Sequence, residues 1–431
     1  MEKKKKTHHL KKEIGLFEAT LYGVGIILGA GIYALIGAGA GVAGNVLWIS
    51  FILGAIIASF TAFSYAELTS MYPEEAAEYA YTKNAFNKQS LSFVVEWLMF
   101  VTSIISATTV ALGFSGYFLK LFGGNQLIIA AILIGVLSVL NYIGIKESAR
   151  YNNISTIIEV GGLLLVVAAG IYYIPSHALG SINFFEMHNG LPGLLSATGL
   201  IFFAFIGFEH LANISEETKN ARKIIPKALL ISLIVSAFLY VLVSLSAIGI
   251  LGADALASSS APMSDTIAHV FPRAGFLLSI IALFATSNTV LVLLIISSRL
   301  LYGLACNNSL PGICRYVGSR GTPTYSIVIV GILAIGGLFI GGIKTVALLT
   351  DVGIFVAYIF VNLSLLVLRY KVPDTKRGYK APLNIGKFSV TAFLGIVTCG
   401  IMLFFFEKEL LWYEVIALGV GFLVYKMFNR K

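Results

Sequence analysis

Four glycines fall within GVGIILGAGIY at residues 23–33, in the middle of a long apolar stretch. They are Gly23, Gly25, Gly29 and Gly31. Each costs a helix interior roughly 1 kcal/mol relative to alanine, so their density predicts a broken helix. The N–H groups at the start of a new helix, where the helix dipole is positive, suit a carboxylate ligand. The alternative is a helix-packing face, because Gly25 and Gly29 also fit G-x-x-x-G.

A second apolar stretch combines a central glycine with a carboxylate. The sequence FAFIGFE sets Gly207 beside Glu209 within residues 191–213. A third stretch, over residues 153–174, carries Glu159 among isoleucines, glycines and leucines. Carboxylates in such long apolar segments are energetically expensive and imply a function by default.

Composition defines the class of protein that positions these residues. Of 431 residues, 58% are hydrophobic and only 12% are charged, whereas soluble domains carry about 25% charged residues. The chain is therefore predicted to be an all-α integral membrane protein. Its first apolar run is too long for a signal-peptide core and no small-residue cleavage pattern follows it, so we expect a retained helix. The three cysteines are too few and too scattered for a disulfide framework or a metal site.

Apolar runs of about 20 residues, the length that crosses a bilayer, predict twelve transmembrane helices. No linker or soluble domain interrupts them, so we expect residues 1–431 to form one transmembrane domain. The predicted spans are 16–40, 45–70, 91–119, 126–145, 153–174, 191–213, 226–251, 275–304, 324–342, 346–368, 387–406 and 410–427.

Basic residues predict the orientation, because cytoplasmic loops collect lysine and arginine. With the amino terminus inside, only Lys120, Arg273, Lys344 and Lys408 fall outside, and the other 26 of the 30 basic residues lie on the cytoplasmic side. Both termini are therefore expected to be cytoplasmic. The net charge of +9 is explained by topology and requires no nucleic-acid partner.

The two glycine-interrupted stretches are the first and sixth spans. This spacing is expected if residues 16–174 and 191–368 are two five-helix repeats of opposite orientation, with residues 387–427 as two peripheral helices. Interrupted helices at matching positions of two halves indicate the binding site of a secondary transporter.

Several motifs resemble, in order, the amino acid–polyamine–organocation (APC) family of secondary transporters. The resemblance extends to about residue 385 and implies the leucine-transporter type of fold, with ten core helices in inverted repeats. The motifs are GVGIILGAGIY, YAELTSMYPEEAAEYAYTKNAF, NYIGIKESARYNN, FAFIGFE followed by EETKNARKIIPKA, FATSNTVLVLLIISSRLLYGLACNNSLP and RYKVPDTKRGYKAP.

The resemblance also implies substrate-binding positions. The carboxylate of an α-amino acid is expected at Ile27, Ala30, Gly31 and Ile32, in the break of the first span. Its α-amino group is expected at backbone carbonyls of the sixth-span break, which maps to Phe203, Ala204 and Ile206. Glu209 is the one acidic group available for a cationic substrate side chain, so we expect neutral or broad specificity. In the third predicted span (residues 91–119), residues from Thr102 to Thr108 are expected to contribute to the pocket.

Coupling is where the chain departs from the family. Proton-coupled relatives carry a lysine in the middle of their fifth membrane span. The matching position in this chain, within residues 153–174, is Glu159. An ionised carboxylate suits sodium, because hard cations prefer oxygen ligands; a desolvated one can itself carry the proton. The expected partners are Thr286, Ser287, Asn288 and the carbonyls of Gly25 and Leu28. The alternative is a neutral Glu159 that packs between helices.

The sequence therefore predicts a plasma-membrane amino acid permease that works by alternating access, driven by H⁺ or Na⁺ and without another cofactor. We expect a monomer or a homodimer in the lipid bilayer. The alternatives are an amino acid/amine or polyamine antiporter, a cationic amino acid carrier, and, from other classes, a membrane enzyme or a channel. Glu67 and Glu78 are expected on a solvated cytoplasmic face or paired with Lys83.

Overall fold

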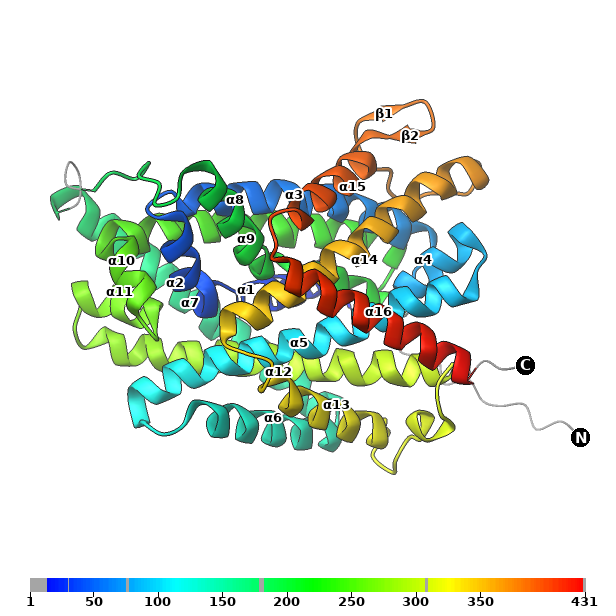
Figure 1. Ribbon diagram of the computed structural model, residues 1–431, viewed down its shortest axis with the longest axis horizontal. Helices are drawn as coiled ribbons and strands as arrows, with labels where there is room; N and C mark the ends of the chain where they lie inside the picture. The colour runs from blue at the N-terminus through cyan, green and yellow to red at the C-terminus, as the bar shows by residue number, and fades with distance from the viewer. Residues whose placement is uncertain (1–13, 30, 75–76, 178–181, 307–308, 429–431) are drawn as a thin grey trace, which may run out of the picture.

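The computed structural model describes residues 14–29, 31–74, 77–177, 182–306 and 309–428. Helices account for almost all of the regular structure (Figure 1). Only one small antiparallel sheet is present in these ranges; it pairs β1 (Asn384–Ile385) with β2 (Phe388–Ser389).

Among the described residues, ten helical stretches are long and apolar enough to cross a membrane. Two shorter apolar helices, α13 (Thr324–Gly337) and α15 (Val390–Leu403), coincide with the ninth and eleventh predicted spans. The chain is thus a multi-pass helical membrane protein. The uninterrupted long helices are α3 (Leu47–Met71), α5 (Gln89–Phe122), α6 (Gln126–Ile143), α7 (Ile145–His177), α9 (Ala221–Leu251), α12 (Ala274–Cys306), α14 (Ile343–Lys371) and α16 (Lys408–Phe428).

Two spans are interrupted, as the glycines predict. The first consists of α1 (Leu16–Leu28) and α2 (Gly31–Ala43). The other begins as α8 (Gly190–Ile201) and continues as two 3₁₀ segments, η1 (Phe202–Phe205) and η2 (Phe208–Glu217). Between the 3₁₀ segments, Gly207 has φ +126°, a backbone conformation that glycine adopts at little steric cost.

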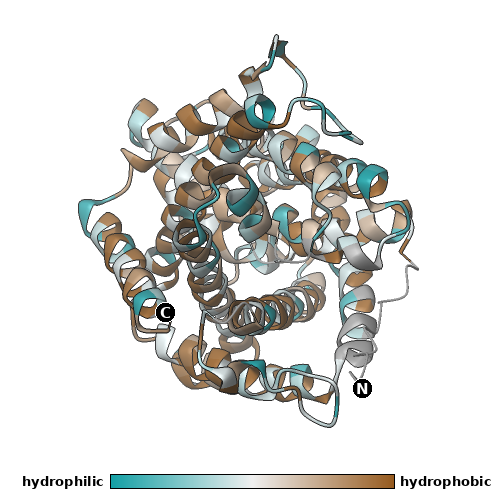
Figure 2. Cartoon of the chain, turned by 90° about the vertical axis from the view of Figure 1, so that its right-hand side faces the viewer, coloured by the Kyte–Doolittle hydropathy of each residue, from teal (hydrophilic) through white to brown (hydrophobic). Residues whose placement is uncertain are grey.

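Helices α5 and α12 run side by side through the middle of the bundle, and α3 packs along α9 (Figure 1). The α6 and α13 helices cover one side, whereas α15 and α16 pack against α14 on another. Figure 2 looks onto one end of the bundle, with apolar residues prominent along the helices. We call this the α4 end, because it carries α4 (Ala77–Phe86).

The opposite end carries α10 (Ala253–Ser258) and α11 (Pro262–Val270), two short helices between α9 and α12. Their region was predicted only as the connection between two spans. Another single 3₁₀ turn, η3 (Gly312–Arg315), connects α12 to α13. These short elements lie between the long helices in sequence, so they do not alter the predicted positions of the long helices.

The expectation that Glu67 and Glu78 lie on a solvated face is wrong. Both side chains are buried. Glu67 pairs with Arg369 and Arg377, and Glu78 accepts a hydrogen bond from the Tyr65 hydroxyl at 2.8 Å. Helix α4, which is short and charged, packs against α5 and α14, and Tyr65 of α3 contacts it. The burial of these glutamates therefore depends on contacts that the local sequence does not reveal.

Candidate functional site

The two helix breaks face one another at the centre of the bundle. A β-carbon on Gly31 would lie 2.1 Å from the Cα of Ala204. A β-carbon on Gly207 would lie 2.5 Å from Cγ2 of Ile26. Both distances are far below any normal contact, so only glycine at these positions allows the two interrupted spans to approach so closely.

A single tyrosine hydroxyl joins the two breaks. Tyr240, on α9, donates a hydrogen bond to the carbonyl oxygen of Ile27 in α1 and is within 2.8 Å of the carbonyl oxygen of Ala204 in η1. Both carbonyls belong to residues predicted to bind substrate. Sequence reasoning missed Tyr240, because one tyrosine in an apolar span gives no signal of its partners.

The breaks enclose a cavity of about 20 Å³. One water molecule requires at least about 10–15 Å³, and pockets for small molecules typically measure about 300–1,000 Å³. The structure is therefore closed around this point, and the walls must separate before an amino acid can enter. The lining residues are Gly25, Ile26, Ile27, Gly31, Ser106, Phe203, Ile206, Gly207, Thr289, Val292 and Leu293.

Four of the eight predicted substrate-binding positions line this cavity. Ile27, Gly31, Phe203 and Ile206 line it, and Ala204 lies against Gly31. Ile32 is buried but is not among the lining residues. Ala30 lies outside the described residues.

On α5, Ser106 is the residue of the expected stretch 102–108 that reaches the cavity. Thr108 instead donates to the carbonyl of Ala334 on α13. The cavity also involves Thr289, Val292 and Leu293 of α12. Their spacing of three and four residues is that of a single helix face, which is a signal that the sequence does contain.

Helix α2 begins at Gly31, so its amino-terminal end meets the cavity. The first N–H groups of a helix have no partner within it, and they carry the positive end of the helix dipole. This end is a ready site for an anion such as a carboxylate. Across the cavity, Ile206 and Gly207 leave helical geometry. The carbonyls of Phe203 and Gly207 accept from the N–H groups of Ile206 and His210, and a carbonyl oxygen can accept a second bond, for example from an ammonium.

Glu209 acts on the backbone of its own break. Its Oε2 accepts hydrogen bonds from the N–H of Gly207 at 2.9 Å and from the Tyr358 hydroxyl at 2.8 Å. The residue is buried and does not line the cavity. Glu209 therefore stabilises the broken conformation and connects it to α14, a role distinct from the predicted contact with substrate.

Glu159 is buried on α7, and both of its carboxylate oxygens lack a hydrogen-bond partner within the described part of the chain. Its backbone carbonyl accepts a bond from the Tyr33 hydroxyl of α2 at 3.1 Å. One turn earlier, Thr156 lies against Gly25, where an added β-carbon would be 2.2 Å from the threonine Oγ1. Glu159 thus lies beside the first interrupted span.

The other predicted coupling residues make their hydrogen bonds elsewhere. Thr286 donates to the carbonyl of Ala282. Ser287 pairs with the Tyr151 hydroxyl at 2.6 Å. Asn288 donates to Asn152 at 3.0 Å, and its own Oδ1 is buried without a partner among the described residues. Thr289, one position further along, is the hydroxyl that lies against Gly29.

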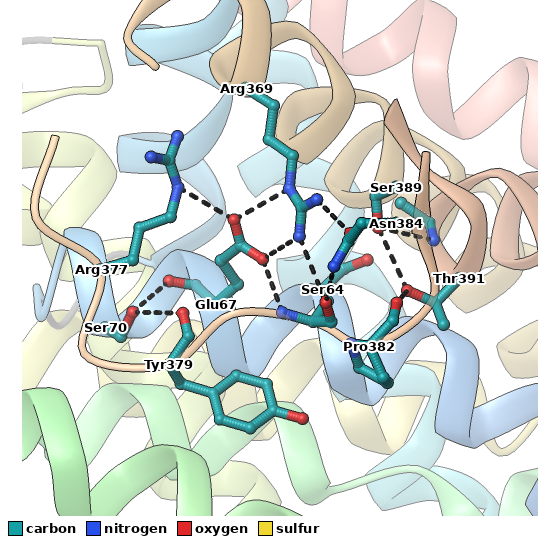
Figure 3. A network of polar contacts seen from close by, with 12 residues as sticks. Ser64, Glu67, Ser70, Arg369, Arg377, Tyr379, Pro382, Asn384, Ser389 and Thr391 are labelled. Atoms are coloured by element: carbon teal, nitrogen blue, oxygen red, sulfur yellow. Dashed lines mark hydrogen bonds and ion pairs between the residues drawn. The ribbon is translucent and has the colours of Figure 1, made fainter. Parts of the chain in front are cut away.

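At the α4 end, a network of ion pairs ties α3 to α14 and to the chain that follows it (Figure 3). Arg369 donates from Nε to Glu67 at 3.0 Å and also contacts it through a terminal nitrogen. Nε of Arg377 lies 3.0 Å from the same carboxylate, and the N–H of Ala381 donates to it at 2.7 Å. We call these four residues the Glu67 clasp.

The fold and the paired helix breaks define a multi-pass helical membrane protein with a central cavity between two interrupted spans. A model of the family described as "Amino acid permease" matches residues 14–422. The chain therefore belongs to the amino acid permease family, whose function is amino acid transport.

Individual relatives agree with this assignment. The chain is similar to the branched-chain amino acid permease BcaP of Bacillus subtilis (strain 168), with 30% identity that covers 98% of this chain and 94% of the relative. It is 29% identical to a methylthioribose transporter of the same strain, over 99% and 95% of the two chains. It is also 29% identical to cationic amino acid transporter 3, mitochondrial, of Arabidopsis thaliana, over 86% of this chain and 65% of the relative.

Proposed function

We propose that the protein transports neutral L-amino acids across the plasma membrane by alternating access. The observation that carries the proposal is the meeting of two interrupted spans at a cavity that includes the amino-terminal end of α2. The α-carboxylate binds there, and the α-amino group binds the carbonyls at the η1–η2 break. Backbone groups alone then recognise an α-amino acid.

The topology proposed with this function has twelve spans, including α13 and α15, and two inverted five-helix repeats. Both termini lie in the cytoplasm, so the α4 end faces inward. This orientation is supported by the excess of lysine and arginine on that side. A monomer or a homodimer is compatible with the proposed mechanism, because each chain contains its own pair of breaks.

The cavity lining supports a neutral substrate. Within the described lining, the polar side chains are Ser106 and Thr289, and the remaining positions are glycine, aliphatic residues and one phenylalanine. A cationic side chain would lose its hydration there without a carboxylate partner, which is strongly unfavourable. The name of one relative includes branched-chain amino acids, and aliphatic side chains of that kind suit this lining.

The coupling ion is proposed to be H⁺ or Na⁺, with Glu159 as its candidate partner. The support is a buried carboxylate with no hydrogen-bond partner in the described chain, beside the first interrupted span. The hydroxyls of Thr156 and Thr289 lie against Gly25 and Gly29 of that span and offer neutral oxygen ligands for a cation.

The test is uptake of a radiolabelled amino acid panel into proteoliposomes under an inward proton gradient, an inward sodium gradient, or unlabelled amino acid inside without a gradient. We expect saturable uptake of neutral amino acids, and loss of ion-driven uptake in Glu159→Gln. Failure of every amino acid, with saturable uptake of putrescine or agmatine, would replace this proposal with an amine carrier. Uptake that never saturates would indicate a channel.

A further inference from the structure

Three carboxylates and one imidazole are buried together near the α4 end. Glu209 is 0% exposed, Glu78 and Glu96 are each 2% exposed, and His210 is 3% exposed. They come from three elements that are separate in sequence, namely η2, α4 and α5. We call these four residues the acid–histidine cluster.

Each member of this cluster makes a polar contact with a neighbouring group. Nε2 of His210 lies 3.6 Å from Oε1 of Glu209, and this buried oxygen has no hydrogen-bond partner among the described residues. Glu78 accepts a bond from the Tyr65 hydroxyl at 2.8 Å. Glu96 accepts one at 3.2 Å from the N–H of Tyr79, the residue next to Glu78.

Two tyrosines fill the space between the carboxylates. The rings of Tyr65 on α3 and Tyr358 on α14 pack edge to face at 5.9 Å. Their hydroxyls donate to Glu78 and to Glu209, respectively. Tyr81 of α4 also packs edge to face against Tyr65, with ring centroids 6.0 Å apart. These tyrosines and the four cluster residues are the titratable groups that surround Glu78.

The charges of the cluster are not balanced by lysine or arginine. In the described ranges, no basic side chain other than His210 lies within ion-pair distance of Glu78, Glu96 or Glu209. The nearby Glu67 clasp provides the contrast, because its buried carboxylate has two arginines. Several buried carboxylates cannot all ionise without such partners, so this cluster retains a proton.

Burial raises the pKa of the Glu78 carboxyl above its ordinary value, and the Glu209 carboxylate adds to this effect. The Tyr65 hydrogen bond and the imidazole of His210 oppose it. Glu78 therefore remains protonated to a higher pH than an exposed glutamate would. When water reaches the cluster, the pKa of the Glu78 carboxyl returns toward its ordinary value, and the proton is released.

We propose that Glu78, His210 and Glu209 form a second proton-binding site, separate from Glu159, through which the coupling proton leaves on the α4 side of the η1–η2 break. The proposal rests on the proposed transport function. Because η2 carries Glu209 and His210, opening of the α4 end would separate them from Glu78 on α4 and admit water. The proton would then leave with the substrate on that side of the membrane.

The test uses full-length protein in proteoliposomes and compares accumulation driven by an inward proton gradient with exchange of labelled for unlabelled amino acid. A gradient of two pH units supports up to about a hundredfold accumulation when one proton accompanies one neutral substrate, because each unit is a factor of ten. For Glu78→Gln we expect an accumulation ratio of about one, because no proton is then linked to the substrate.

The matched control is Glu414→Gln, which changes a buried carboxylate on α16 outside the cluster and should accumulate like the wild type. If Glu78→Gln does not fold, His210→Gln must show the same loss. Wild-type accumulation by either variant, or a wild type driven only by sodium, would overturn the proposal.

A second readout separates this proposal from the transport function. Infrared difference spectra between wild type and Glu78→Gln at neutral pH should contain a protonated-carboxyl stretch that is absent from the difference spectra between wild type and Glu414→Gln. If the wild type exchanged no amino acid, the transport function would fail, and this band would still decide the proton site. Absence of this band from the difference spectra between wild type and Glu78→Gln would overturn it.

Discussion

Gly31 is the residue at which the two interrupted spans come closest. Its position next to Ala204 leaves no space for a side chain, since an added β-carbon would lie 2.1 Å from a backbone atom. A flexible side chain can move aside from such a contact, but backbone held in a 3₁₀ segment cannot do so without shifting the break itself. The closed conformation therefore depends on the absence of one methyl group.

We predict that Gly31→Ala prevents closure around substrate and reduces exchange in proteoliposomes to the level of empty liposomes. The control is Gly161→Ala on α7, where an added β-carbon meets nothing within 4 Å. That change should leave transport intact, because alanine is the better helix former. Normal exchange by Gly31→Ala, at equal reconstitution, would show that the breaks need not approach this closely.

The site was only partly predictable at the scale of single residues. Gly31 and Gly207 were visible because glycine clusters in an apolar segment are energetically costly. Tyr240 was not visible, because its role depends on two carbonyls from segments far away in the sequence. The hydrogen-bond partners of Thr286 and Ser287 were not visible for a similar reason: the sequence places both on one helix but does not say which way each faces.

At the scale of elements, the breaks are stabilised by helices that are themselves continuous. Helix α9 contributes Tyr240 to both breaks, and α14 contributes Tyr358 to Glu209. The two halves of each interrupted span are therefore held in place by neighbouring helices that are continuous. The 3₁₀ form of η2 was not predicted, because apolar periodicity does not reveal that a side chain will bind the N–H of Gly207.

We predict that Tyr240→Phe lowers the free energy of unfolding by about 1–3 kcal/mol, because it leaves two buried carbonyls without the hydroxyl. The measurement is thermal unfolding of the purified protein in detergent. Tyr173→Phe is the control, since that hydroxyl is exposed and pairs with His269. Equal melting temperatures for wild type and Tyr240→Phe would argue that the bridge between the breaks has little energetic weight.

At the scale of the whole molecule, the two ends of the bundle differ in their ion pairs. The α4 end contains the buried Glu67 clasp, whereas the α10–α11 end has a partly exposed pair between Lys120 and Asp265. Removing one partner of a buried pair leaves an uncompensated charge, which costs about 3–5 kcal/mol. Exposed pairs contribute about 0–1 kcal/mol.

The clasp should therefore dominate stability. We predict that Glu67→Gln destabilises the protein by about 3–5 kcal/mol and that Lys120→Gln changes its stability by less than about 1 kcal/mol, as measured by denaturant unfolding of both variants. Equal effects would indicate that the arginines of the clasp are hydrated in solution.

The proposed orientation can be tested with native cysteines. Cys306, at the end of α12, is exposed, whereas Cys314 and Cys399 are buried. With the α4 end in the cytoplasm, a membrane-impermeant maleimide should label inverted vesicles and leave intact cells unlabelled, and Cys306→Ser should remove the signal. Labelling of Cys306 in intact cells would reverse the topology.

The overall arrangement was more predictable than its contacts. Hydropathy located all the long helices, because a bilayer requires about 20 apolar residues in each span. It did not reveal the buried positions of Glu67 and Glu78, which depend on α14 and on chain near residue 381. Short helices such as α10 and α11 were also missed, because a length criterion for spans cannot detect them.

The central claim is that backbone at the two breaks binds the α-carboxylate and the α-amino group of the substrate. The most direct measurement is competition against uptake of a neutral amino acid by three analogues that keep its side chain. They are the decarboxylated amine, the α-keto acid and the D-enantiomer. The account predicts that none competes as well as the unlabelled L-amino acid, since each loses or misplaces one backbone contact. Equal competition by the amine or by the keto acid would contradict recognition by both breaks.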